Sequence, residues 1–194
     1  GERSAVSSRM LYTFAQRYDE WDGHDYEGSS LAGAMLGLRE KGVCLEEEWP
    51  LAHKGTLPGP AVMNAALLNR PANMLSVELR KDVLKAAIFE HKAVVVSLTV
   101  HKDWDHVQRG LIPYNRQQAK SSAYASGGHA VAILGYTPQG FLIQNSWGSK
   151  WTTAVIGKHR YPGMAILSYD DAQDNITDAW ALTLTQEPFN PPQV

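Results

Sequence analysis

Apolar residues recur at every third or fourth position in two stretches near the start of the chain. The first stretch follows a serine pair at 7–8, and the second follows a serine pair at 29–30. A serine side chain can accept a hydrogen bond from the free N–H groups at a helix start, so each pattern predicts a helix that begins at its serine pair. Gly42, directly after Lys41, predicts the end of the second helix.

The pattern changes further along the chain. A third helix is expected after a cap at Ser76, and strands predominate beyond it. These strands are expected at residues 93–100, 130–136, 141–144, 164–169 and 179–185. Because the helices precede the strands and do not alternate with them, the order indicates an α+β fold.

The composition is that of a folded domain. Of 194 residues, 44% are hydrophobic and 20% are charged, which is enough apolar material for a sizeable core. Eighteen Lys and Arg residues against twenty Asp and Glu residues give a net charge of −2, so nothing indicates binding to nucleic acid or to an anionic membrane. The apolar run at 93–100 is far too short to span a membrane. We therefore expect no nucleic-acid partner and no membrane association.

The number of cysteines indicates the redox state of the cellular compartment in which the protein is found. The single cysteine, Cys44, cannot form an internal disulfide, which favours a reducing environment and a cytoplasmic location. The sequence starts with Gly1 and not with methionine, so a trimmed N-terminus leaves secretion open.

Two short motifs carry the candidate chemistry. Gly127-Gly128-His129 opens one strand of the predicted hairpin, and Asn145 closes the other, 16 residues after His129. The strands of a hairpin run antiparallel, so these ends can meet, and the Asn145 oxygen can accept from one ring nitrogen of His129. The other nitrogen is then free to take a proton from a nucleophile, and Trp147 can shield the pair from water. The competing interpretation is a satisfied core histidine beside a turn asparagine.

In these segments the sequence resembles the papain-like cysteine peptidases. The resemblance is carried by GGHAVAILGY (127–136) and QNSWGSKW (144–151), and the family's catalytic His and Asn fall on His129 and Asn145. Upstream, EGSSLAGAMLGLREKGVCLEEEWP (27–50) and SSRMLY (7–12) are similar to the bacterial-type branch of the family. The resemblance implies a papain-like two-lobed fold, with a helical left lobe, an antiparallel β-barrel-like right lobe, and an active-site cleft between the lobes.

The resemblance also implies a domain plan. Residues 1–194 are expected to form a single papain-like domain, with a mainly helical lobe over about 1–60, a mainly β lobe over about 61–187, and an extended tail at 188–194. A peptide or protein substrate is implied, and no metal or organic cofactor. Small residues are expected to line the substrate cleft and to leave a roomy pocket for a large apolar side chain beside His129. These residues are Gly28, Ser29, Ser30, Gly127, Gly128 and Ala130.

A ligand-rich cluster, His101, Asp103, Asp105 and His106, lies outside these motifs. Its spacing matches no common metal-binding pattern, so we interpret it as a solvated loop and expect no metal site.

The family's nucleophile has no counterpart in the sequence. The family motif places its cysteine roughly 130–150 residues before the His and Asn motifs, which corresponds to a position at or before Gly1. Cys44 follows a predicted helix end and precedes three glutamates, and both features disfavour a thiolate. We therefore interpret Cys44 as structural.

Several interpretations stay open. The chain can be part of a cysteine peptidase whose Cys-bearing N-terminal segment is a separate or excised piece. It can be a papain-fold pseudoenzyme that binds peptides or serves as an interaction module. Another residue can replace the nucleophile, or the same Cys–His–Asn chemistry can serve an acyltransferase that uses an amine acceptor.

Overall fold

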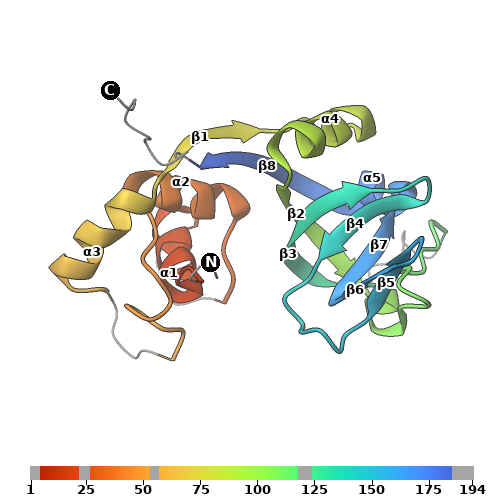
Figure 1. Cartoon of the computed structure of the whole chain (residues 1–194), viewed down its shortest axis with the longest axis horizontal. Coiled ribbons are helices and arrows are strands. Elements are labelled where there is room, and N and C mark those ends of the chain that lie inside the picture. Colours follow the sequence, from red (N-terminus) through yellow and green to blue (C-terminus); the bar gives the residue numbers. More distant parts are fainter. Residues whose placement is uncertain (1–4, 22–26, 53–56, 118–123, 185–194) are drawn as a thin grey trace, which may run out of the picture. The chain divides into compact units, whose positions relative to one another are not determined.

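The computed structural model describes residues 5–21, 27–52, 57–117 and 124–184 (Figure 1). The chain divides into two compact units, as a two-lobed fold requires. Unit 1 holds the chain up to Met74 and the described part of the segment from Leu182 on, and unit 2 is Leu75–Ala181. The division falls after Met74, whereas the sequence placed the change near residue 60. The tail expected at 188–194 lies outside the described residues.

Unit 1 is helical, and its helix starts follow from local capping. The hydroxyl oxygen of Ser7 accepts from the Met10 N–H, and that of Ser30 accepts from the Gly33 N–H, both at 3.0 Å. The two predicted helix starts are therefore confirmed. The helical elements of unit 1 are α1 (Ser8–Tyr18), α2 (Leu31–Lys41), α3 (Pro60–Ala66) and the short 3₁₀ helix η1 (Leu67–Asn69).

The core of unit 1 forms where these helices meet. Met10 and Phe14 of α1 pack with Leu38 of α2, with Trp49 and with Ala66 at the end of α3. The start of α3 follows Gly59 and carries Pro60 at its first position, which suits a residue whose ring fixes φ and lacks an N–H. The sequence pattern did not reveal this helix.

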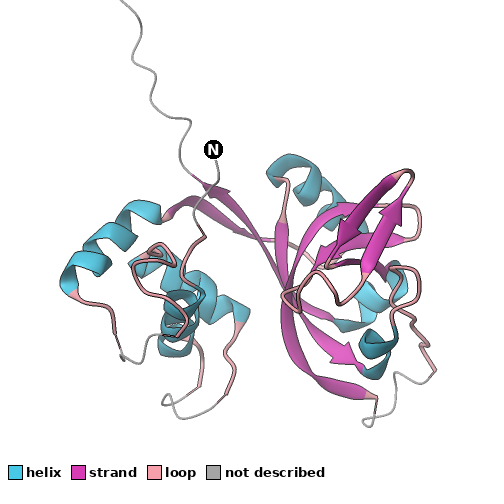
Figure 2. Ribbon diagram, turned by 60° about the horizontal axis from the view of Figure 1, so that its bottom comes forward, coloured by secondary structure: helices cyan, strands magenta, loops and turns pink. Residues whose placement is uncertain are grey.

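The main sheet has six strands in the order β1-β8-β2-β3-β4-β7, and all of it except most of β1 and the end of β8 belongs to unit 2. Figure 2 shows these strands with the separate β5–β6 ribbon beside them. The pairings of β2 with β3 and β8, of β3 with β4, and of β4 with β7 are antiparallel. The sheet is open, with β1 and β7 at its edges. Its strands are β1 (Pro71–Ser76), β2 (Val94–His101), β3 (Ala125–Tyr136), β4 (Gly140–Gln144), β7 (Met164–Ser168) and β8 (Ile176–Leu184), and the ribbon is β5 (Thr153–Ile156) with β6 (His159–Pro162).

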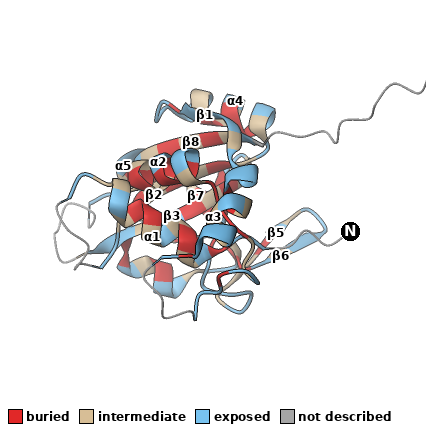
Figure 3. Ribbon diagram, turned by 90° about the vertical axis from the view of Figure 1, so that its left-hand side faces the viewer, coloured by how far each residue is buried: buried red, intermediate tan, exposed pale blue. Residues whose placement is uncertain are grey.

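The core of unit 2 lies between this sheet and two helices, α4 (Lys81–His91) and α5 (Tyr169–Asn175). Buried positions follow β2, β7 and β8, as the red segments of Figure 3 show. Val94 and Val96 of β2 and Ala179 of β8 are fully buried. The predicted α+β class is confirmed, and among the described residues no helix is long and apolar enough to cross a membrane.

Two predicted boundaries are wrong, and pairing explains both. Ser76 ends β1 and caps no helix, because the adjoining Val77 N–H donates to the Ala179 carbonyl at 2.8 Å and keeps the chain extended. The helix starts only at Lys81. Strand β3 begins at Ala125, well before residue 130, because its first residues pair with the end of β2.

Gly42 provides a test of the packing in unit 1. Its φ of +68° is unfavourable for other residues, and a Cβ there would lie 1.9 Å from the Ala66 carbonyl oxygen. We expect Gly42→Ala to lower the free energy of unfolding by at least about 2 kcal/mol in a denaturant titration. At Gly135 the nearest atom to an added Cβ is 3.9 Å away, so Gly135→Ala should change stability little. Equal effects of the two variants would contradict this account.

Candidate active site

The β3–β4 hairpin brings the two motif residues together. His129 lies in β3, where it pairs with Leu98 of β2, and Asn145 directly follows the last residue of β4. The Nε2 atom of His129 and the Oδ1 atom of Asn145 are 2.8 Å apart. The predicted hydrogen bond between the two side chains is therefore confirmed.

The surroundings of Asn145 orient this bond. The Asn145 Oδ1 also accepts a hydrogen bond from the Ser146 backbone N–H at 2.8 Å. The backbone N–H of Asn145 donates to the Gly163 carbonyl at 3.2 Å. Because the amide oxygen accepts, the Nε2–H of His129 must donate to it. Nδ1 is then the ring nitrogen that can take a proton.

Three tryptophans pack together beside His129, and we call Trp104, Trp147 and Trp151 the tryptophan cluster. The Trp147 ring lies 5.1 Å from that of His129 at a tilt of 32°, as the sequence led us to expect. Trp104 meets the edge of His129 at 6.3 Å and 89°, and it stacks on Trp151 at 5.7 Å. The indole N–H of Trp151 also donates to the Trp104 carbonyl at 3.1 Å.

The sequence analysis missed Trp104 and Trp151 as parts of the site. Trp151 stood within the QNSWGSKW motif, whose second tryptophan was an available signal. Trp104 lies in η2 (Lys102–His106), inside the stretch that we interpreted as a solvated loop, yet it is 1% exposed. A large aromatic residue between charged neighbours was the only signal that this stretch is anchored in the core.

Unpaired polar atoms gather at this site. Within the part of the chain that the structure describes, His101 Nδ1, Trp104 Nε1 and Asn145 Nδ2 are buried without a hydrogen-bond partner.

A pocket of about 190 Å³ opens beside His129. The predicted residues Gly127 and Gly128 line it, and so does Trp147. Ala130 does not line it, because side chains alternate along β3 and that of Ala130 points to the face opposite His129. The full lining is Val100, His101, Asp105, Ser126, Gly127, Gly128, His129 and Trp147.

The other predicted cleft residues belong to unit 1, where they have structural contacts of their own. The Gly28 N–H donates to the Tyr12 hydroxyl, and the Ser29 hydroxyl donates to Asp19 Oδ2, each at 2.8 Å. Ser30 caps α2. A role of Gly28, Ser29 and Ser30 in a substrate cleft stays a prediction.

The cluster interpreted as a solvated loop is partly buried. His101 Nε2 lies 2.9 Å from Asp171 Oδ2, and Asp103 accepts a hydrogen bond from the Tyr124 hydroxyl. Over the described ranges, no three His, Cys, Asp or Glu side chains are arranged to hold a metal ion.

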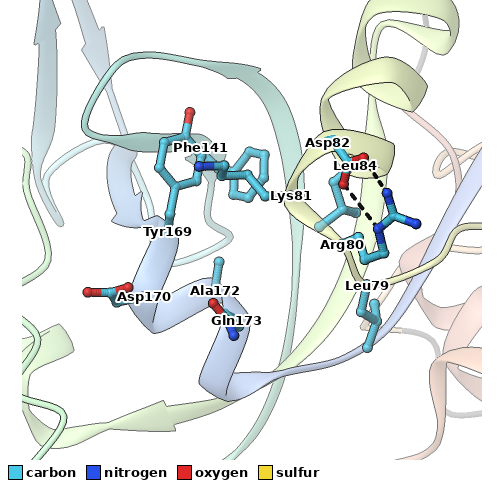
Figure 4. Close-up of a pocket in the computed structure, with 10 residues that line it drawn as sticks. All are labelled: Leu79, Arg80, Lys81, Asp82, Leu84, Phe141, Tyr169, Asp170, Ala172 and Gln173. Carbon is cyan, nitrogen blue, oxygen red and sulfur yellow. Dashed lines mark hydrogen bonds and ion pairs between the residues drawn. The ribbon is translucent and has the colours of Figure 1, made fainter.

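A second pocket of unit 2, of about 320 Å³, lies at the starts of α4 and α5 (Figure 4), and His129 is not among its lining residues. Its charged groups already have partners inside the protein. Arg80 forms an ion pair with Asp82, and the Lys81 ammonium lies 4.9 Å from the centre of the Tyr169 ring. We assign no function to this pocket.

Cys44 is fully buried in the core of unit 1. Burial raises the pKa of its thiol, and the negative charges of Glu48 and Glu46 raise it further. These effects oppose formation of a thiolate, the form in which cysteine acts as a nucleophile.

Comparison with known proteins points to one family. The family model described as Papain family cysteine protease matches residues 23–160. An uncharacterized peptidase C1-like protein of Acanthamoeba polyphaga mimivirus is 23% identical over 200 residues, which cover 95% of this chain and 61% of that protein. The chain thus spans about three fifths of the length of this relative.

Solved structures agree on the fold. Xylellain, a cysteine protease from Xylella fastidiosa, superposes with a TM-score of 0.77 at 20% identity, over 96% of this chain and 72% of its own. A cysteine protease from Carica candamarcensis gives a TM-score of 0.64 at 18% identity, over 96% and 80%. These similarities confirm the predicted papain-like fold.

The environment of Cys44 predicts a slow thiol. In the folded chain at pH 8, we expect Cys44 to react with a soluble disulfide reagent at least about 100-fold more slowly than in denaturant. Because its pKa is raised, labelling of the folded chain should accelerate only at a higher pH than labelling of the unfolded chain. The measurement is the absorbance of the released thiolate over time, and equally fast labelling of the two states would contradict the prediction.

Proposed function

The chain belongs to the papain family of cysteine proteases, and from that premise we propose that it supplies the base and its orienting asparagine to a peptidase whose nucleophilic cysteine lies outside this sequence. The observation that carries the proposal is the 2.8 Å hydrogen bond between His129 and Asn145. A histidine held in one tautomer beside an open pocket is the arrangement that proton transfer to and from a nucleophile requires.

The proposed reaction follows from that geometry. Nδ1 of His129 takes the proton of the cysteine thiol, and the thiolate attacks the peptide carbonyl. As the C–N bond breaks, the imidazolium returns its proton to the leaving amine and an acyl-enzyme remains. Water, deprotonated by the same nitrogen, then releases the acid and restores the thiol. Throughout this cycle Asn145 keeps the ring oriented, and the tryptophan cluster limits access of water to the His129–Asn145 bond.

Cys44 is a poor candidate for this nucleophile. It is the single cysteine of the sequence, it is fully buried, and its thiol pKa is raised. We therefore assign the nucleophile, with its share of the oxyanion-binding donors, to a Cys-bearing segment or chain that joins this one.

The pocket beside His129 is proposed to hold one side chain of the peptide substrate. Gly127 and Gly128 keep it open, and Val100 and Trp147 add apolar surface. We propose that it accepts a large apolar side chain.

One prediction of this proposal concerns the source of the nucleophile. The 194-residue chain alone should not cleave a fluorogenic peptide, because general-base catalysis by His129 supplies only about 10²–10⁴-fold without the covalent step. With the native upstream residues restored, we expect cleavage that a thiol-directed inhibitor abolishes. His129→Ala should abolish it too, whereas Cys44→Ala should leave it nearly unchanged.

Four outcomes would contradict the proposal or favour another function. Inhibitor-sensitive cleavage by the 194-residue chain alone would refute the proposal. Loss of activity in a folded Cys44→Ala variant would make Cys44 the nucleophile. No cleavage by the restored protein, even over a broad peptide mixture, would favour the pseudoenzyme, and amide products formed with an added amine would favour an acyltransferase.

Another prediction of this proposal concerns the pocket beside His129. Ser126 lines the pocket and is exposed, so Ser126→Val should add bulk at the pocket wall and narrow it without disturbing the core. We expect this variant of the restored protein to lose roughly 10-fold or more in kcat/KM for peptides with a large apolar residue at the matching position, and little for peptides with alanine there. Ala130→Val is the matched control, because Ala130 lies on the same strand outside the pocket lining. Equal losses for both peptides, or no preference of the unmodified protein for large apolar residues, would contradict the assignment.

A further inference from the structure

A second histidine lies next to the proposed active site and takes no part in the reaction described above. His101 is the last residue of β2, and its Nε2 lies 2.9 Å from Oδ2 of Asp171 in α5. Their side chains are 1% and 0% exposed. The other oxygen of Asp171 accepts from the Asn175 side-chain amide at 2.8 Å, so the carboxylate is held on both sides.

Aromatic rings enclose the His101 imidazole. The Tyr124 ring is stacked on it at 4.7 Å and 8°, and the Tyr124 hydroxyl donates to Asp103 of η2. Burial and the Asp103 carboxylate raise the pKa of Tyr124, so its hydroxyl keeps the proton that it donates. Tyr124 directly precedes β3 and Asp103 belongs to η2, so their hydrogen bond joins these two segments. The His101 ring lies at this junction, stacked on Tyr124.

This packing reaches the proposed base through one side chain. Trp104 lies three residues after His101, and its ring meets the His101 ring edge-on at 6.4 Å. The same Trp104 ring meets His129 at 6.3 Å and Trp147 at 5.9 Å. The Trp104 ring therefore contacts His101 on one side and His129 on the other.

The stability of the fold alone does not account for a buried histidine–carboxylate pair. Removing both groups from water costs free energy, and well-packed apolar residues of similar volume are often as stable as such a pair, or more so. What the pair adds is a directed hydrogen bond between α5 and the end of β2. An apolar contact does not fix orientation in this way.

We propose that His101 and Asp171 are positioning residues of the proposed active site, which set the place of Trp104 and thereby hold the His129 ring in one orientation and one tautomer. This inference rests on the proposed function for its purpose. Its structural content, that the pair controls the state of His129, can be tested without any peptidase activity.

The test uses nuclear magnetic resonance of the imidazole nitrogens of His129 in the 194-residue chain. In the unmodified chain we expect well-separated signals for Nε2 and Nδ1, as for a single tautomer with Nε2 protonated. In Asp171→Asn, which keeps the shape of the side chain but loses its charge, we expect the two signals to move toward each other. Asp170→Asn is the matched control on the same helix, because Asp170 is exposed and contacts Arg116, not His101.

A double variant keeps the test decisive if Asp171→Asn fails to fold. His101→Phe combined with Asp171→Leu removes both polar groups together and should fold with stability equal to or above that of the unmodified chain. We expect its His129 signals to show mixed tautomers all the same. Unchanged His129 signals in a folded variant would overturn the proposal. So would failure of the double variant to fold, because the pair would then be a requirement of the fold itself.

Activity gives a second measurement in the protein with its upstream residues restored. There Asp171→Asn, which leaves the pocket lining unchanged, should lower kcat about 10-fold and leave KM within about 2-fold, as expected when the reacting group and not the binding surface is disturbed. If the restored protein has no peptidase activity, the proposed function fails but the resonance measurement still decides the role of the pair. Mixed tautomers together with an unchanged kcat would overturn the role in catalysis.

Discussion

The candidate site depends on the register of β3 between its two neighbouring strands. His129 pairs with Leu98 of β2, and Ala132, three positions later, pairs with Gln144 of β4, so that Asn145 leaves the sheet beside the histidine. Side chains alternate between the faces of a strand, and His129 therefore shares a face with the buried residues Val131 and Ile133. A slip by one residue would present Gly128 or Ala130 to that face, and no base would remain. Core packing and the proposed chemistry thus select the same register.

Polar groups gather around the base, where His101, Asn145 and Asp171 are buried and His129 is half-buried. Such groups are costly unless they are hydrogen-bonded, and a low local dielectric strengthens the bonds that do form. The His129–Asn145 and His101–Asp171 bonds, at 2.8 and 2.9 Å, share this environment, with the Trp104 ring between the two histidines. One aromatic side chain therefore contacts the histidines of two polar pairs that have no hydrogen bond in common.

The parts of the structure that follow from neighbouring residues were predictable from the sequence. The caps at Ser7 and Ser30 lie directly before the helices that they start, and the β3–β4 hairpin closes over a short turn. Ser76 shows the limit of this reasoning, because a serine suited to a helix start ends a strand once β8 lies beside it. The His101–Asp171 pair was beyond reach for the same reason. Its members are 70 positions apart, and only the folded sheet brings them together.

Every side chain that orients the proposed base belongs to unit 2. Asn145, the tryptophan cluster and the His101–Asp171 pair all lie within Leu75–Ala181, as does His129 itself. The geometry of the base is therefore built by one sheet and its own connections, and it does not require the nucleophile to be present. In a family whose chemistry needs a thiol beside the imidazole, this arrangement makes the base a preformed half of the site. A chain can then retain its histidine–asparagine bond whether or not a cysteine is ever delivered to it. For this reason the hydrogen bond is a feature that the chain shares with its family independently of the nucleophile.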